Sequence, residues 1–146
     1  MDTEPTSIIG RINRIAQIIQ LRSDIVLAAN GITRAEFDML SLLARTGRPM
    51  TPTELAGELL ISGAGATKRL KKLRDAGLIQ REANPRDGRG ALIHMTAKAH
   101  ELLRPILESV LGFEAALLSR LSASTRRELA RDLRALLTGL EPPAGS

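Results

Sequence analysis

The chain has 146 residues, of which 43% are hydrophobic, and its 21 Lys and Arg residues exceed its 16 Asp and Glu residues by five. This length is sufficient for one domain with a buried core. The absence of Cys excludes disulfides, zinc–thiolate sites and thiol chemistry. Two Phe are the only aromatic residues, which disfavours the binding of single strands by base stacking. A basic chain of this kind favours a double-stranded nucleic acid as partner.

No apolar run approaches the roughly 18–20 residues that a membrane span requires. The first residues are acidic and no hydrophobic stretch typical of a signal peptide follows them. The sequence therefore predicts a cytoplasmic protein without a membrane partner.

The net charge is confined to one segment of the chain. Residues 62–90 contain eight basic and three acidic side chains, whereas the other 117 residues contain thirteen of each sign. Such complete localisation predicts a binding surface for a polyanion rather than an ordinary solvated face.

The first predicted elements are two helices with a turn between them. Residues 8–28 carry Ile at helical spacing on more than one face, which predicts a helix buried on more than one side. Asn30-Gly31 is typical of a helix end. Thr33 to Glu36 has the pattern of a capping box, and the helix that it begins extends to about Arg45.

Two shorter helices follow. Thr51 to Glu54 is a second capping box, and it begins a helix at 53–60 with Leu55, Ala56, Leu59 and Leu60 expected to point inward. A turn at 61–63 leads to a helix at 64–76, with Gly77 just after its end.

The periodicity then changes from helical to alternating. Residues 78–82 and 91–95 are predicted strands of a hairpin, with a turn-rich loop at 84–90. Leucine-rich helices are predicted at about 97–120 and from Ser122 to Leu140, with Glu141-Pro142-Pro143 ending the last one. The expected fold is mainly α with a small β-hairpin wing (α+β), a winged helix-turn-helix between N- and C-terminal helices.

The second short helix of this motif has two chemically different faces. Ala66, Leu70 and Leu73 form an apolar face for the core, and the opposite face is basic. Such a helix enters the major groove by its N-terminal half, and the hairpin loop reaches a neighbouring groove or its phosphates. The candidate DNA-binding residues are Ser62, Gly63, Ala64, Thr67, Lys68, Arg69, Lys71, Lys72, Arg86 and Arg89.

The residues at 61–70, 73–81 and 85–90 resemble the MarR family of bacterial transcriptional regulators. The resemblance implies one domain over 1–146, with a DNA-binding core at 33–96 and dimerisation helices at 1–30 and 97–141. It also implies a homodimer on a pseudo-palindromic operator, and a repressor or occasionally an activator tuned by a small anionic or phenolic ligand. Asp87 and Arg89 are expected to brace the wing by a salt bridge, although Gly88 replaces the Arg usual between them.

A narrower resemblance concerns the ligand. Asp38, Arg69 and Arg81 have the spacing of an Asp and two Arg that contribute to ligand response in the urate-responsive branch of the family. That branch also uses a Trp, which this chain lacks.

Other functions fit the sequence less well. Gly63 to Lys68 lacks the full pattern of a phosphate-binding loop, and His94 and His100 alone predict no metal site. No catalytic constellation is present in the sequence, so we expect neither an enzyme nor a cofactor. An architectural DNA-binding protein without an effector and a helical interaction module remain as alternatives.

Overall fold

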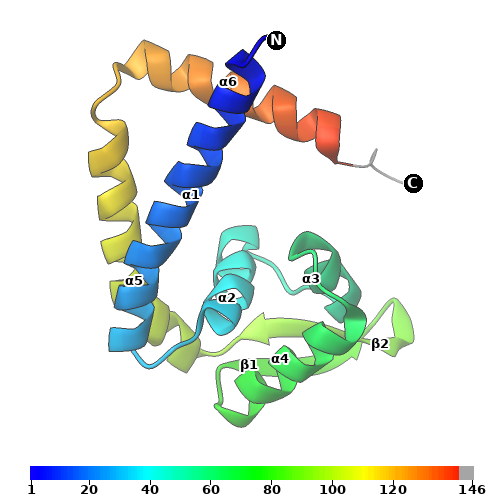
Figure 1. Cartoon of the computed structure of the whole chain (residues 1–146). Helices are drawn as coiled ribbons and strands as arrows, with labels where there is room; N and C mark the ends of the chain where they lie inside the picture. The colour runs from blue at the N-terminus through cyan, green and yellow to red at the C-terminus, as the bar shows by residue number, and fades with distance from the viewer. Residues whose placement is uncertain (142–146) are drawn as a thin grey trace. The chain divides into compact units, whose positions relative to one another are not determined.

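The computed structural model describes residues 1–141, and for Asp87 and Arg89 only the backbone. The elements in chain order are α1 (Glu4–Ala29), α2 (Arg34–Thr46), α3 (Pro52–Glu58), α4 (Gly63–Asp75), β1 (Ile79–Asn84), β2 (Asp87–Met95), α5 (Ala97–Leu118) and α6 (Ala123–Leu140) (Figure 1). This order confirms the mainly helical fold with one hairpin. The chain divides into two compact units, Met1–Ser109 and Val110–Ser146. Within the described span, no helix is long and apolar enough to cross a bilayer.

Local capping explains where several helices begin. The Thr51 hydroxyl accepts the Glu54 N–H and the Glu54 carboxylate accepts the Thr51 N–H, which is the complete capping box predicted for α3. At α2 the Thr33 hydroxyl accepts the Glu36 N–H. The Glu36 carboxylate accepts a hydrogen bond from the Thr33 hydroxyl at 2.9 Å. The second bond of the predicted capping box therefore joins the two side chains instead of reaching the Thr33 backbone N–H. Ser122 caps α6 as predicted.

The core of the first unit lies where α2, α3, α4, the hairpin and the start of α5 meet. Met50 adds a short bridge to β2, because its N–H and carbonyl pair with those of Ile93 at 3.0 and 2.7 Å. The side chains that are almost completely buried are Leu27, Met39, Leu40, Leu55, Leu73, Ile93, Leu103 and Ile106. This packing fixes the hairpin and the helix-turn-helix against each other.

Leu60 does not point inward as predicted. Helix α3 ends at Glu58, and Leu60 has a left-handed backbone with φ of +55°. Because Leu60 no longer follows the helical period, its side chain points into solvent and is 93% exposed.

The hairpin is longer than predicted and its loop is shorter. The strands pair antiparallel from Ile79 opposite Met95 to Asn84 opposite Asp87, with an irregularity next to Asn84. Strand β2 therefore begins at Asp87 instead of residue 91. The Asn84 side-chain oxygen accepts the Arg86 N–H at 3.0 Å, and this local turn closes the hairpin around two residues.

The terminal helices are much less buried than their sequence predicts. In α1 only Ser23 and Leu27 are buried, so the expected burial on more than one side is wrong for the single chain. In α6 no residue is buried. The exposed apolar side chains are Ile8, Ile9, Ile15, Ile18, Leu21 and Ile25 of α1 and Leu129, Leu133, Leu136, Leu137 and Leu140 of α6. One copy of the chain does not cover this surface.

Candidate nucleic-acid interface

Helix α4 presents its two faces as predicted. The Ser62 hydroxyl accepts the Gly65 N–H at 3.0 Å and fixes the start of the helix. Ala66, Leu70 and Leu73 are buried against the core. The helical period therefore directs the basic side chains of α4 away from the core and into solvent.

The exposed face of α4 combines small and basic residues. The residues exposed there include Ser62, Gly63, Ala64, Thr67, Lys68, Lys71 and Lys72, whereas Arg69 is half-buried. The Thr67 hydroxyl donates to the Gly63 carbonyl at 3.0 Å. Lys71 forms an exposed ion pair with Asp75 at 3.2 Å. Lys68 and Lys72 form no such pair within the described residues, so their charges are available to a partner.

The C-terminus of α4 is held by the start of α5. Gly77 has a φ of +75°, and the Leu78 N–H bonds to the Leu73 carbonyl at 2.9 Å, which closes the helix end. The Lys98 ammonium donates to the Ala76 carbonyl at 2.8 Å. The Thr96 hydroxyl donates to the Gly77 carbonyl at 2.7 Å. These bonds anchor the C-terminal end of α4, whereas Ser62, Gly63 and Ala64 at its N-terminal end are exposed.

The wing carries Arg86 at the tip of the hairpin, where its side chain is exposed. The predicted salt bridge between Asp87 and Arg89 lies outside the described side chains, so it stays a prediction. A Cβ added to Gly88 would meet no atom within 4 Å, so the site where the MarR pattern usually has Arg is open.

The three candidate ligand residues are not all gathered in one place. Burial raises the pKa of Asp38, while the positive charges of Arg34 and Arg69 act in the opposite direction. Asp38 and Arg69 are therefore within electrostatic reach of each other. Arg81 lies on β1 and lines a shallow hollow with Arg74, Ile79, Gln80, Glu82 and His94.

Arg34 is a residue that the sequence interpretation missed. Its guanidinium forms an ion pair with Asp24 of α1 at 2.7 Å and donates to the Gln20 carbonyl at 3.1 Å and to the Ser23 hydroxyl. It also lies 3.8 Å from the Asp38 carboxylate. Arg34 therefore ties the first helix to α2, and through Asp38 this group of charges extends toward Arg69 on α4. Its position in the first turn of α2 gave no signal of this role, because the partners are 10–14 residues away in the chain.

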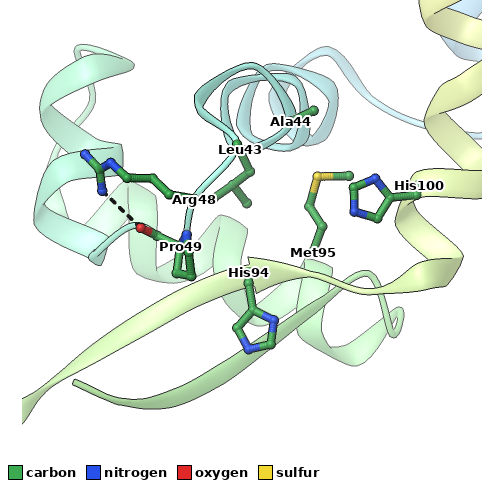
Figure 2. Close-up of a pocket in the computed structure, with 8 residues that line it drawn as sticks. Leu43, Ala44, Arg48, Pro49, His94, Met95 and His100 are labelled. Atoms are coloured by element: carbon green, nitrogen blue, oxygen red, sulfur yellow. Dashed lines mark hydrogen bonds between the residues drawn. The ribbon is translucent and has the colours of Figure 1, made fainter. Parts of the chain in front are cut away.

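A separate hollow of about 190 Å³ lies between the end of α2 and the start of α5, lined by Leu43, Ala44, Gly47, Arg48, Pro49, His94, Met95 and His100. Figure 2 shows the Met95 side chain beside the His100 ring, with the His94 ring on the other side of β2. His94 and Met95 are neighbours in β2 and point to opposite faces, so the His94 ring lies across the strand from Met95 and from the His100 ring beside it. His94 lies 3.8 Å from Glu82 instead. Among the side chains that the structure describes, no group of three or more potential metal ligands occurs.

The comparisons agree with this geometry. Residues 30–90 match the MarR family. The chain is 30% identical to the HTH-type transcriptional regulator PecS of Dickeya dadantii (strain 3937) over 143 residues, 97% of this chain and 84% of that protein. It resembles the crystal structure of NadR in complex with 4-hydroxyphenylacetate, with a TM-score of 0.79, 27% identity, and coverage of 91% of this chain and 92% of that one. It also shares its fold with a MarR family regulator from Streptomyces coelicolor crystallised with DNA, with a TM-score of 0.82, 23% identity, and coverage of 98% and 91%.

The fold and the basic face of α4 define a winged helix-turn-helix protein. The chain belongs to the MarR family, whose members are transcriptional regulators and generally not enzymes.

Proposed function

We propose that this protein is a sequence-specific regulator of transcription that binds a pseudo-palindromic operator in double-stranded DNA as a homodimer. The observation that carries the proposal is the exposed, basic N-terminal half of α4, whose other face is buried. Small residues at Gly63 and Ala64 allow the helix backbone to approach the DNA closely. Lys68 and Lys72 supply charges that displace counterions from phosphates. The DNA complex of the Streptomyces coelicolor protein, which has the same fold, supports this arrangement.

The homodimer accounts for the exposed apolar surface of the terminal helices. The apolar residues of α6 recur at helical spacing between Leu129 and Leu140, yet none is buried in the single chain. An uncovered stripe of this kind marks an interface between protein surfaces. A second copy of the chain supplies a matching stripe, as a symmetric dimer requires. The two winged helix-turn-helix units of the dimer can then enter successive major grooves about 34–36 Å apart.

A test of the dimer uses the α6 stripe directly. Sedimentation of the wild-type protein at micromolar concentration is expected to give a dimer. Leu133→Glu on α6 is expected to shift it toward monomer, because a carboxylate placed in an apolar interface loses its hydration. Glu128→Gln on the same helix is the matched control and is expected to leave the dimer intact. A wild-type monomer would refute this part of the proposal.

A test of DNA binding measures fluorescence anisotropy on the DNA upstream of the protein's own gene and on random DNA at several salt concentrations. The affinity is expected to fall steeply with salt. Thr67→Ala and Lys68→Ala are expected to reduce the preference for the specific site more than the general affinity, because both residues lie in the half of α4 that enters the groove. Equal losses on both DNAs would exclude base readout, and equal wild-type affinity for both would favour an architectural DNA-binding protein.

We propose further that the protein acts as a repressor and that a small anionic or phenolic ligand releases it from DNA. The complex of NadR with 4-hydroxyphenylacetate supports a phenolic acid as the class of ligand. Asp38, Arg69 and Arg81 are the candidate ligand residues. Asp38 and Arg69 are within electrostatic reach of each other, Arg81 lines a separate hollow on β1, and each arginine suits an anion. Such a ligand would bind more tightly to a form of the dimer in which the two α4 helices are not spaced for successive major grooves. It would lower the DNA affinity only by the difference between its affinities for the two forms.

Calorimetric titration of 4-hydroxyphenylacetate, salicylate and urate tests the effector. Binding is expected to weaken in Arg69→Ala and Arg81→Ala relative to Arg104→Ala, a control on α5. Ligand at saturation is expected to weaken DNA binding in the anisotropy assay. If a ligand binds without any change in DNA affinity, the regulatory part of the proposal is wrong.

A further inference from the structure

Leu60 has an unusual backbone for its residue type. It is the one non-glycine residue within the described chain with a positive φ, at +55°. The ends of α1, α2 and α4 are each followed or closed by a glycine in the same left-handed region, at Gly31, Gly47 and Gly77. Leu60 occupies the equivalent place after α3, where the Ile61 N–H bonds to the Ala56 carbonyl at 3.0 Å. Glycine is the residue that adopts this conformation without steric cost, and leucine is strained there.

The left-handed backbone closes α3, but a glycine would form the same turn, so the leucine side chain gives the fold nothing in return for its strain. The Leu60 side chain is 93% exposed, so it contributes no packing to the core. The residues on either side, Leu59 and Ile61, are half-buried. Leu60 therefore combines a strained backbone with an apolar side chain in water. Residues that keep a strained conformation without an internal benefit are concentrated at functional sites.

The place of Leu60 indicates which function this is. It lies two residues before Ser62, the N-cap of α4, and three and four residues before the exposed Gly63 and Ala64 that the proposed function places against DNA. A side chain at this point is at the edge of the groove that α4 enters. DNA offers apolar groups there, namely the C–H faces of the deoxyribose and the methyl group of thymine.

From these observations we infer that Leu60 is a DNA-contacting residue, which packs its side chain against deoxyribose or a thymine methyl beside the N-terminus of α4. This inference rests on the proposed function, since it requires α4 to bind duplex DNA. The contact is apolar, so it adds affinity without releasing counterions. It differs in this respect from the contacts of Lys68 and Lys72, which depend on salt.

Three substitutions separate the backbone from the side chain. Leu60→Gly removes the side chain and relieves the strain, so it is expected to raise the melting temperature by about 2–6 °C while weakening DNA binding. Leu60→Ala keeps the strain and is expected to weaken DNA binding with little change in melting temperature. Leu60→Met keeps an apolar side chain and is expected to retain wild-type affinity. Loss of a partly buried leucine side chain in Leu60→Gly or Leu60→Ala corresponds to an affinity about 3- to 10-fold lower than that of the wild type for each α4 bound.

The measurement is fluorescence anisotropy on the specific operator at several salt concentrations, together with thermal unfolding. The losses in Leu60→Gly and Leu60→Ala are expected to be equal at all salt concentrations, with the salt slope of the wild type. If both variants bind as tightly as a wild-type protein that does bind duplex DNA, the inference is wrong and the proposed function stands. If the wild type binds no duplex, the proposed function fails first.

The same assay on DNA with deoxyuridine in place of thymidine identifies the group that is contacted. Loss of the wild type's advantage over Leu60→Gly on this DNA assigns the contact to a thymine methyl. An unchanged advantage assigns it to deoxyribose.

Discussion

Lys72 and Leu73 are adjacent in α4 but lie on opposite faces, and this predicts opposite consequences of their loss. Leu73 has an exposed fraction of 0%. Leu73→Ala removes three buried carbon atoms, worth about 0.8 kcal/mol each, and leaves a cavity that raises the cost to about 3–4 kcal/mol. A domain is typically stable by only about 5–15 kcal/mol, so this variant is expected to be folded but markedly less stable.

Lys72→Ala has no such packing to lose. Its side chain is exposed, so the free energy of unfolding is expected to change by no more than about 0.5 kcal/mol. Its affinity for both specific and random DNA is expected to fall, and the salt slope is expected to decrease by about 1 for one lost phosphate contact. Urea unfolding followed by circular dichroism measures the stability, and fluorescence anisotropy at several salt concentrations measures DNA binding.

The pair is its own control, because the two variants truncate neighbouring residues of one helix. Leu73→Ala, measured at a temperature where it is fully folded, is expected to keep the salt slope of the wild type. Two results would refute the reasoning. One is a loss of stability in Lys72→Ala comparable with that in Leu73→Ala, and the other is an unchanged salt slope in Lys72→Ala.

Three further tests use variants in other parts of the structure. Arg34→Ala is expected to lower the free energy of unfolding by about 1–2 kcal/mol in urea titrations, because it removes a half-exposed ion pair and hydrogen bonds between α1 and α2, and Arg34→Lys is expected to restore only part of this. Gly57→Ala, in open space within α3, is expected to raise the melting temperature. Gly77→Ala is expected to lower it, because a non-glycine residue at φ +75° loses about 1–2 kcal/mol of stability. The hydrogen bond from Arg48 lowers the pKa of Glu54 from 4.5. This stabilisation is present above that value and lost as the pH falls through the lowered pKa, so the stability difference between wild type and Glu54→Gln is expected to disappear on acidification, and a constant difference would contradict it.

Features that depend on neighbours along the chain could be predicted from the sequence. The capping box at Thr51 and Glu54 and the glycine after α4 each involve residues within a few positions of one another. The two faces of α4 also follow from the helical period alone, which separates Leu70 and Leu73 from the lysines. Residue order and helical geometry are therefore sufficient to predict this helix and its basic face.

Features that depend on distant residues were decided by the tertiary structure. The link from Arg34 to α1 joins residues 10–14 positions apart across a turn, and no local pattern specifies which of several acids an arginine reaches. The outward direction of Leu60 has a local cause instead, the end of α3 before Leu60, although the apolar period of that helix predicted the opposite.

The terminal helices give the clearest contrast. Their apolar residues predict that these surfaces are buried, since hydrophobic periodicity reflects burial of any origin. The structure shows that a single chain leaves most of α1 and all of α6 uncovered. Sequence determines how much apolar surface a helix carries, because that depends on residue type and period. Only the packed chain decides which part is covered from within, because burial depends on elements that are remote in sequence.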